Sequence, residues 1–146
     1  MEQLAVERML ELVVAEAQRL FVQEGVATRC GCVGGDFFTS VPAGGEAYLL
    51  KSVLHNWDDG QSVTILKNCR RAMAEHARLL VVERVIPPGN EPAEAKLFDM
   101  NMLVVLAGLE RTEAEYQALF QATGFQLTRV IPTQSPLSII EGMPIV

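Results

Sequence analysis

Residues 47–59 read Ala-Tyr-Leu-Leu-Lys-Ser-Val-Leu-His-Asn-Trp-Asp-Asp. The first eight of these, Ala47 to Leu54, are apolar at nearly every position, which is typical of a parallel strand covered on both faces. A helix is expected directly afterwards, because Asp58 as N-cap with Gln61 three residues later fits a variant of the capping box. A strand that leads into a helix in this way is typical of an α/β fold.

The residues after this stretch continue the alternation of strands and helices. Thr112 and Glu115 form a second capping box, and Gly124 ends the helix that it opens. The last two strands are joined by Pro132-Thr133-Gln134-Ser135-Pro136, which predicts a closing hairpin. The expected strands are Arg78 to Ile86, Phe125 to Ile131 and Leu137 to Ile140, and the expected helices are Glu94 to Leu106 and Thr112 to about Thr123.

Before residue 47 we expect one helix and one short strand. The helix runs from Leu4 to Glu24, where apolar side chains follow helical spacing, and the strand runs from Cys30 to Val33. Because strands alternate with helices and two adjacent strands come last, the sequence predicts an α/β fold with a mostly parallel sheet and an antiparallel edge. No linker or internal repeat divides the chain, so residues 1–146 are expected to form one domain.

The composition makes several classes of partner poor candidates. The 146 residues carry 12 Lys and Arg against 18 Asp and Glu, and the resulting net charge of −6 disfavours nucleic acid and anionic membranes. No apolar stretch approaches the ~20 residues of a membrane span, and the acidic N-terminus lacks signal-peptide features, so a cytoplasmic protein is expected. Cys30, Cys32 and Cys69 are an odd number for a disulfide framework and are interpreted as small buried apolar residues.

Residues capable of acid–base chemistry or binding follow three of the expected strands. Gly34-Gly35-Asp36-Phe37-Phe38 follows the first, His55-Asn56-Trp57 the second and Glu83-Arg84 the third. Because open α/β sheets bind ligands at the carboxyl ends of their strands, these residues are expected to meet at one edge. One histidine with two separate carboxylates suggests a general base that is held by acids.

Most of these residues also have a simpler structural explanation. Asp36 can be a turn former after two glycines, and His55 can be a histidine with satisfied hydrogen bonds near a helix start. Glu110-Arg111 can be plain surface charge. Glu83 is harder to explain in this way, since a carboxylate at the mouth of a buried strand is costly unless it is paired or functional.

Several well-known site motifs are missing from the sequence. It contains no GxSxG nucleophile elbow, no GxxxxGK[ST] phosphate loop and no GxGxxG dinucleotide fingerprint. It contains no HxxxH or CxxC pair either, so a metal site is not expected.

Four ordered segments resemble the S-adenosylmethionine-dependent O-methyltransferases. They are Val33 to Phe38, Leu50 to Asp59, Leu80 to Glu83 and Leu109 to Tyr116. The group that they resemble includes the caffeic acid, acetylserotonin and polyketide O-methyltransferases. The resemblance implies a Rossmann-like class I methyltransferase sheet, S-adenosyl-L-methionine as cofactor, and methylation of a phenolic or enolic hydroxyl on a small aromatic or polyketide-like molecule.

The resemblance also implies roles for individual residues. His55 matches the family's general base, and Glu83 and Glu110 match the acids that flank it. Met102 matches a position that clamps the substrate. Asp36 matches the residue on the adenine amino group, Phe37 its apolar neighbour and Lys51 a position near the methyl donor. The positions that match the cofactor site are Gly35, Asp36, Phe37, Lys51 and Trp57.

These implied roles agree with the chemistry of hydroxyl methylation. A phenol has a pKa of about 10, so its oxygen is a poor nucleophile at neutral pH. An imidazole within hydrogen-bond reach can remove the proton and contributes typically ~10²–10⁴-fold to the rate. Two acids beside the imidazole would raise its basicity and stabilise the imidazolium that forms.

The sequence departs from the family pattern before residue 30. The glycine-rich cofactor loop and the N-terminal dimerisation domain have no counterpart, and Glu11 lies out of register with the acid that binds ribose. Residues 1–146 are therefore interpreted as a truncated catalytic domain. An alternative interpretation is a non-catalytic remnant or interaction module that needs a partner chain to complete the cofactor site.

This truncation implies a change in the sheet. The family order is 3-2-1-4-5-7-6, so loss of strands 1 and 2 leaves 4-5-7-6 and separates the strand at 30–33 from that at 47–54. The strand at 47–54 then becomes an exposed edge, through which a homo-oligomer or a partner chain can pair. Alternatively, the strand at 30–33 shifts to pair directly with it.

Overall fold

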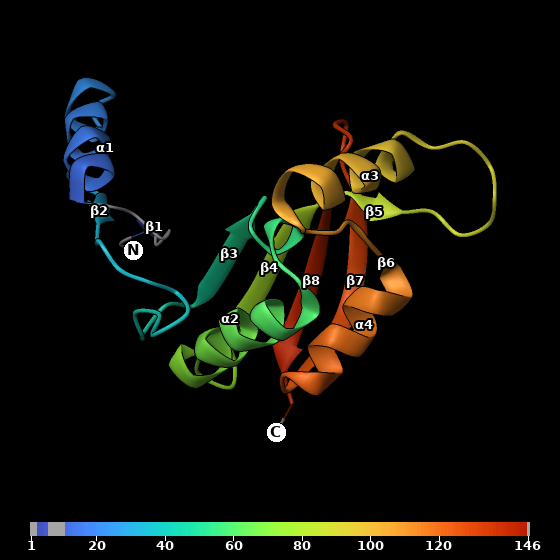
Figure 1. Cartoon of the computed structure of the whole chain (residues 1–146). Coiled ribbons are helices and arrows are strands. Elements are labelled where there is room, and N and C mark those ends of the chain that lie inside the picture. Colours follow the sequence, from blue (N-terminus) through green and yellow to red (C-terminus); the bar gives the residue numbers. More distant parts are fainter. Residues whose placement is uncertain (1–2, 6–10, 146) are drawn as a thin grey trace.

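The computed structural model describes residues 3–5 and 11–145. The elements from β3 onward form one body, and β1, α1 and β2 lie to one side of it (Figure 1). The helices are α1 (Glu11–Gln23), α2 (Asp59–Ala72), α3 (Glu94–Leu106) and α4 (Glu113–Ala122), with a 3-10 turn, η1, at Leu54–Asn56. The strands are β1 (Gln3–Ala5), β2 (Cys30–Cys32), β3 (Ala47–Lys51), β4 (Arg78–Glu83), β5 (Val85–Ile86), β6 (Arg111–Thr112), β7 (Phe125–Pro132) and β8 (Ser138–Pro144).

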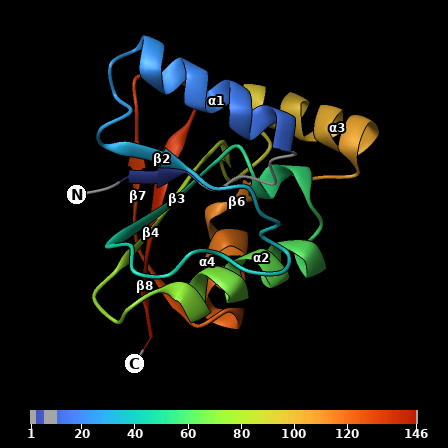
Figure 2. The ribbon, with the colours of Figure 1, turned by 90° about the vertical axis from the view of Figure 1, so that its left-hand side faces the viewer.

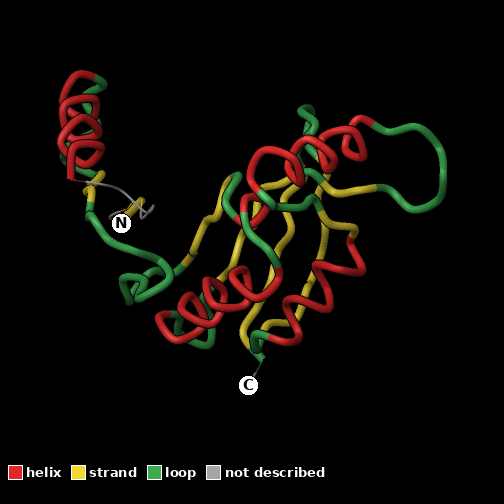
Figure 3. Tube along the Cα trace, viewed as in Figure 1, coloured by secondary structure: helices red, strands yellow, loops and turns green. Residues whose placement is uncertain are grey.

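Four strands form the main sheet, in the order β3-β4-β8-β7 (Figures 1 and 3). β3 and β4 are parallel, while β8 is antiparallel to both β4 and β7. This order confirms the expected arrangement 4-5-7-6. The expected antiparallel hairpin at one edge of the sheet is confirmed as well: β7 and β8 pair antiparallel there, with β8 inside the sheet and β7 at its edge.

The helix starts follow from local sequence. Asp58 caps α2, and its side chain accepts a hydrogen bond from the backbone N–H of Gln61. Thr112 and Glu115 form a full capping box at the start of α4. Each cap satisfies a backbone donor that the first helical turn leaves free. Both capped starts and the bounds of α3 were therefore predicted correctly from the sequence.

The core lies between the sheet and the two helices α2 and α4, which cover the same face (Figures 1 and 2). Full burial of one large apolar side chain contributes about 1.5–3 kcal/mol, so this layer supplies much of the stability. The expected burial is confirmed for Cys69, and this burial raises the pKa of its thiol to about 12. Cys30 and Cys32 are only half-buried. Fully buried core residues include Leu54, Ile65, Leu66, Leu79, Val81, Tyr116, Phe120, Phe125 and Ile140.

Strand β3 is shorter and more exposed than its sequence suggests. It ends at Lys51, because Ser52 adopts a left-handed conformation with φ 54° and Leu54 enters η1. Leu50 points into the core, whereas Leu49 is 59% exposed on the other face, which no described helix covers at this point. The expectation of a strand from Ala47 to Leu54 covered on both faces is therefore wrong.

The N-terminal elements stand apart from the main sheet. β2 pairs in parallel with β1 and not with β3, so the expected separation of this strand from the sheet is confirmed. The expectation of a helix from Leu4 is wrong at Gln3–Ala5, where pairing with β2 gives a strand, and residues 6–10 lie outside the described part. Among the described residues, no helix is both long and apolar enough to cross a membrane.

Candidate active site

His55 lies in η1, between the end of β3 and the start of α2. Its Nδ1 is 2.9 Å from Oε1 of Glu110 and 3.6 Å from Oε2 of Glu83. Glu83 ends β4, and Glu110 precedes β6, so the two acids come from different parts of the chain. The structure thus brings together the histidine and the two carboxylates that the sequence singled out.

Glu83 holds the turn that carries His55. Its Oε1 accepts hydrogen bonds from the backbone N–H groups of Val53 and Leu54, both at 2.9 Å. Its Oε2, which faces His55, has no hydrogen-bond partner among the described residues. The side chain is fully buried, and burial raises the pKa of its carboxyl against the opposing effects of His55 and the two N–H groups.

Glu110 is placed by its backbone. Its N–H donates to Oδ1 of Asp99 on α3 at 2.8 Å, a tether that the sequence did not reveal. The neighbouring Leu109 N–H donates to the carbonyl of His55 at 3.0 Å. At Gly108 a Cβ atom would lie 2.0 Å from that same carbonyl oxygen, so only glycine permits this close approach. The segment before β6 therefore lies directly against η1.

The charges around His55 favour its protonated form. The hydrogen bond that His55 donates to Glu110 is the largest effect and raises the His55 pKa above 6.5, while partial burial opposes the rise. The negative charges of Glu83 and Glu110 and a backbone contact to Ser52 add to the rise. The arrangement can thus take up a proton and stabilise the resulting imidazolium.

Arg111 binds the loop between η1 and α2 from inside the protein. Its side chain is 1% exposed, so the interpretation of Glu110-Arg111 as surface charge is wrong. The guanidinium donates to the carbonyls of Leu54 and Trp57, each at 3.1 Å. It also reaches Asp59 at 2.9 Å and the Ser62 hydroxyl at 3.1 Å. These bonds fix both ends of the segment that carries His55.

The segment around Asp36 forms a tight turn. The carbonyl of Asp36 accepts from Thr39 N–H at 2.8 Å and Ser40 N–H at 3.0 Å. One carboxylate oxygen accepts from Phe38 N–H at 3.0 Å, so Asp36 is indeed a turn former. Its other carboxylate oxygen makes no hydrogen bond within the described residues and is available to a ligand. Gly35, which precedes the turn, is exposed.

Three aromatic rings join this turn to the histidine segment. Phe38 and Trp57 meet edge to face with ring centroids 4.8 Å apart, and Phe37 lies 5.0 Å from Phe38. Phe37 is only 6% exposed and packs in the core. The half-buried rings of Phe38 and Trp57 therefore offer the aromatic surface here, and Phe38 was not singled out from the sequence.

The remaining predicted residues lie on neighbouring elements. Lys51 ends β3 with an exposed side chain. Met102 is 8% exposed on α3, and its carbonyl accepts from Gly108 N–H at 3.3 Å. Neither contacts His55 through a hydrogen bond. The structure thus places a cation and a buried thioether on elements next to the histidine, without showing what they bind.

Comparison with known proteins decides the family. Residues 8–126 match the profile of the O-methyltransferase domain. The chain belongs to the O-methyltransferase family. It is 53% identical over 133 residues to a phenazine O-methyltransferase, PhzM, from Lysobacter antibioticus, and this match covers 91% of the chain and 39% of the relative. The resemblance identified from the sequence is therefore confirmed.

Solved structures of other proteins have the same fold. The crystal structure of LaPhzM is 49% identical, has a TM-score of 0.92, and is matched over 99% of this chain and 43% of its own length. CalO1, a methyltransferase of calicheamicin biosynthesis with SAH bound, is 43% identical with a TM-score of 0.87 over 98% of this chain and 41% of its own. The chain thus spans about two fifths of the length of these relatives.

Several side chains of this chain fit parts of S-adenosylmethionine, the cofactor implied by the resemblance. The free carboxylate oxygen of Asp36 can accept from an adenine amino group, and Phe38 and Trp57 offer aromatic surface for the ring. The exposed ammonium of Lys51 suits the cofactor's carboxylate. His55, Glu83 and Glu110 also place one nitrogen and two oxygens within 4.8 Å, a set that can in principle hold a metal ion.

Proposed function

We propose that this chain carries the acid–base residues of an S-adenosylmethionine-dependent O-methyltransferase, with His55 as the general base. The observation that carries the proposal is the contact of His55 Nδ1 with Glu110 at 2.9 Å, backed by Glu83 at 3.6 Å. A histidine held by buried acids at the carboxyl edge of a sheet is the arrangement that proton removal from a substrate hydroxyl needs.

The hydrogen bond to Glu110 decides which nitrogen acts. An ionised carboxylate can only accept, so Nδ1 donates its hydrogen to Glu110. The lone pair then lies on Nε2, which takes the proton from the substrate hydroxyl. The imidazolium that forms is stabilised by both acids, and such general-base catalysis contributes typically ~10²–10⁴-fold.

The residues around Asp36 are proposed to hold the cofactor. Asp36 binds the adenine amino group, Phe38 and Trp57 cover the ring, and Lys51 binds the carboxylate. When bound, S-adenosylmethionine supplies a methyl group that its sulfonium already activates. The role of the protein is then to hold the deprotonated oxygen in line with that methyl group. The SAH-bound CalO1 structure supports this choice of cofactor.

We further propose a small aromatic molecule with a phenolic or enolic hydroxyl as substrate. The name of the phenazine O-methyltransferase from Lysobacter antibioticus supports this class. Met102 is proposed to contact the substrate, because α3 packs beside η1. Because the matched relatives are more than twice as long, we infer that residues 1–146 correspond to one part of a catalytic domain.

The test combines binding and turnover. The purified chain is titrated with S-adenosylhomocysteine by calorimetry, with Asp36→Ala as the comparison, and labelled methyl transfer to a panel of hydroxylated aromatics is measured. We expect Asp36→Ala to weaken binding and His55→Gln to reduce transfer by about 100-fold or more. Addition of EDTA should leave transfer unchanged if the three side chains act without a metal ion.

Each arm can contradict a different part of the proposal. Transfer that survives in His55→Gln excludes this residue as the base. Loss of transfer in EDTA, restored by a divalent cation, replaces the base mechanism with a metal-assisted one. A folded chain that binds no S-adenosylhomocysteine favours the alternative in which a partner chain must complete the cofactor site.

A further inference from the structure

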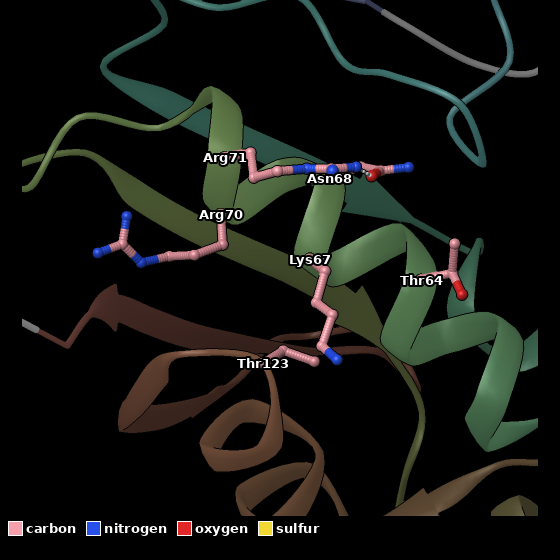
Figure 4. Close-up of a pocket in the computed structure, with 6 residues that line it drawn as sticks. All are labelled: Thr64, Lys67, Asn68, Arg70, Arg71 and Thr123. Carbon is pink, nitrogen blue, oxygen red and sulfur yellow. Dashed lines mark hydrogen bonds between the residues drawn. The ribbon is translucent and has the colours of Figure 1, made fainter.

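One buried side chain ties the Asp36 turn to α2. Asn68, which is 3% exposed, donates from Nδ2 to the carbonyl oxygen of Phe37 at 2.7 Å. Its Oδ1 accepts from Nη2 of Arg71, and Figure 4 shows the Arg71 side chain extending to Asn68. Both halves of the amide are therefore used. A carbonyl on one side and a guanidinium on the other also establish which amide atom is nitrogen and which is oxygen.

The pocket beside these residues does not explain them. It is open, has a volume of about 330 Å³, and lies along α2 (Figure 4). Its charged side chains do not converge, since Lys67, Arg70 and Arg71 point in different directions. Arg70 is already bound to the carbonyls of Gly124 and Ile145. The pocket thus offers no convergent anion site, whereas the bond from Asn68 reaches the turn proposed to bind adenine.

The turn depends on this bond for its position in the protein. Its internal hydrogen bonds use the carbonyl and one carboxylate oxygen of Asp36, and they set only its local shape. The contacts that connect it to the body of the protein include the packing of the Phe37 and Phe38 rings against the core and Trp57, and the hydrogen bond from Asn68 to the Phe37 carbonyl. Without that hydrogen bond, only ring packing and the bond from Phe38 N–H to Asp36 orient the peptide between Phe37 and Phe38, so the direction of the Asp36 carboxylate is less well fixed.

Helix α2 also fixes the histidine segment. Ser62, near the start of α2, accepts from Arg111, and the same guanidinium binds the carbonyl of Leu54 next to His55. Asn68 lies six positions after Ser62, which is roughly 9 Å along a helix. One rigid element therefore sets the spacing between the proposed base and the proposed adenine site.

We propose that Asn68, oriented by Arg71, is a positioning residue for cofactor binding. It holds the Asp36 turn at a fixed distance from the segment that carries His55. This inference rests on the proposed function, because it assigns the cofactor to the Asp36 turn. The distance between the cofactor site and the base matters because small displacements of reacting groups lower the reaction rate strongly.

The variant Asn68→Asp tests this inference with almost no change in size. The carboxylate keeps an acceptor for Arg71 but loses the N–H that binds the Phe37 carbonyl. Asn90→Asp, in the exposed loop before α3, introduces the same chemical change and charge as a control. The first readout is hydrogen exchange of the Thr39 and Ser40 amides without ligand, and the second is calorimetric affinity for S-adenosylhomocysteine.

We expect exchange at Thr39 and Ser40 to be about tenfold faster in Asn68→Asp, while Leu79–Val82 in β4 stays within about twofold. Affinity for S-adenosylhomocysteine should fall by about tenfold, with Asn90→Asp unchanged. Unchanged exchange in the turn, or equal acceleration throughout the chain, overturns the inference. Local acceleration with unchanged affinity overturns the positioning role and leaves the proposed function intact.

A third result separates the two proposals. If the unsubstituted chain binds no S-adenosylhomocysteine, the cofactor site of the proposed function fails for this chain alone. The exchange readout then decides by itself whether Asn68 holds the turn, because it needs no ligand.

Discussion

At the residue scale, the site depends on where the protons of His55 lie. His55 Nδ1 lies 2.9 Å from Glu110 Oε1 and 3.6 Å from Glu83 Oε2. Glu110 therefore orients the ring, and the negative charges of both acids act on it. Both acids are buried, and each has one carboxylate oxygen without a hydrogen-bond partner in the described part of the chain. Negative charge buried in this way is costly unless a positive charge forms beside it. The site therefore favours the imidazolium.

Replacing Glu110 by Gln should lower the His55 pKa, because the charged hydrogen bond that raises it most is lost. The measurement is a pH titration of the His55 ring resonance by NMR, in a His76→Gln background that leaves one histidine. In the proposed mechanism methyl transfer needs neutral His55, so the rising limb of its pH profile should move to lower pH in the variant. An unchanged His55 midpoint would show that Glu110 does not control the ring.

The same shift predicts the sign of a pH effect on stability. The pKa of His55 is 6.5 in the unfolded chain and higher in the folded chain. Protonated His55 therefore contributes its full stabilisation at pH below 6.5, and this contribution is lost as pH rises through the folded-state pKa. In Glu110→Gln the gain in stability as pH falls from above the folded-state pKa to 6.5 should be smaller. Urea unfolding at a series of pH values measures it.

Arg111 is expected to matter for stability more than any exposed cation. Arg111→Met removes the charged donor from the carbonyls of Leu54 and Trp57 and leaves them only the Trp57 N–H and the Ser62 hydroxyl, which should cost about 3 kcal/mol of unfolding free energy. Lys67→Met on the exposed face of α2 is the matched control and should stay within about 0.5 kcal/mol. Urea unfolding compares the two, and equal values would refute the structural role of Arg111.

At the scale of elements, β3 is the exposed part of the sheet. It pairs only with β4 among the described strands, so its other edge presents free backbone groups. Leu49 adds exposed apolar surface on its uncovered face. Natural sheets protect such edges with charged residues, because an open edge can pair with another chain.

Leu49→Lys should therefore reduce self-association of the chain. The lysine places a charge beside the open edge and removes apolar surface. The free energy of unfolding should change by no more than about 0.5 kcal/mol. Gln121→Lys on exposed α4 adds the same charge elsewhere as a control. Sedimentation velocity over a range of concentrations measures association. An equal reduction by both variants would attribute the effect to net charge instead of the edge.

At the scale of the whole molecule, the chain consists of a main body and an N-terminal appendage. The main body has a continuous core between the sheet and the helices α2 and α4. β1, α1 and β2 lie apart from it (Figure 1), and α1 leaves Leu20 and Val22 exposed. A segment with few buried apolar contacts opens at lower free energy than the core.

Hydrogen exchange measured by mass spectrometry should reveal this division. We expect the amides of α1 and β2 to exchange well before those of Leu79–Val82 in β4, where Leu79 and Val81 are fully buried. Protection of α1 equal to that of β4 would mean that the appendage is held as firmly as the core. The comparison needs no ligand and no variant.

Much of this structure could be read from local sequence. The capping residues Asp58, Thr112 and Glu115 predicted two helix starts, because a cap acts within one turn of its own chain. The resemblance implied the strand order and the group of His55, Glu83 and Glu110. Local patterns failed at β3, since the apolar run from Ala47 to Leu54 does not reveal that Ser52 ends the strand or that one face stays uncovered.

The sequence alone therefore determined the family, the capped helices and the grouping of His55, Glu83 and Glu110, because each depends on residue types at fixed spacing. Only the tertiary structure decided that Arg111 is buried, that Asp99 tethers Glu110, and that Asn68 holds the carbonyl of Phe37. These contacts join residues that are 11 to 57 positions apart. A side chain's charge or polarity is visible in the sequence, but its burial and its partner depend on which distant segments fold against it.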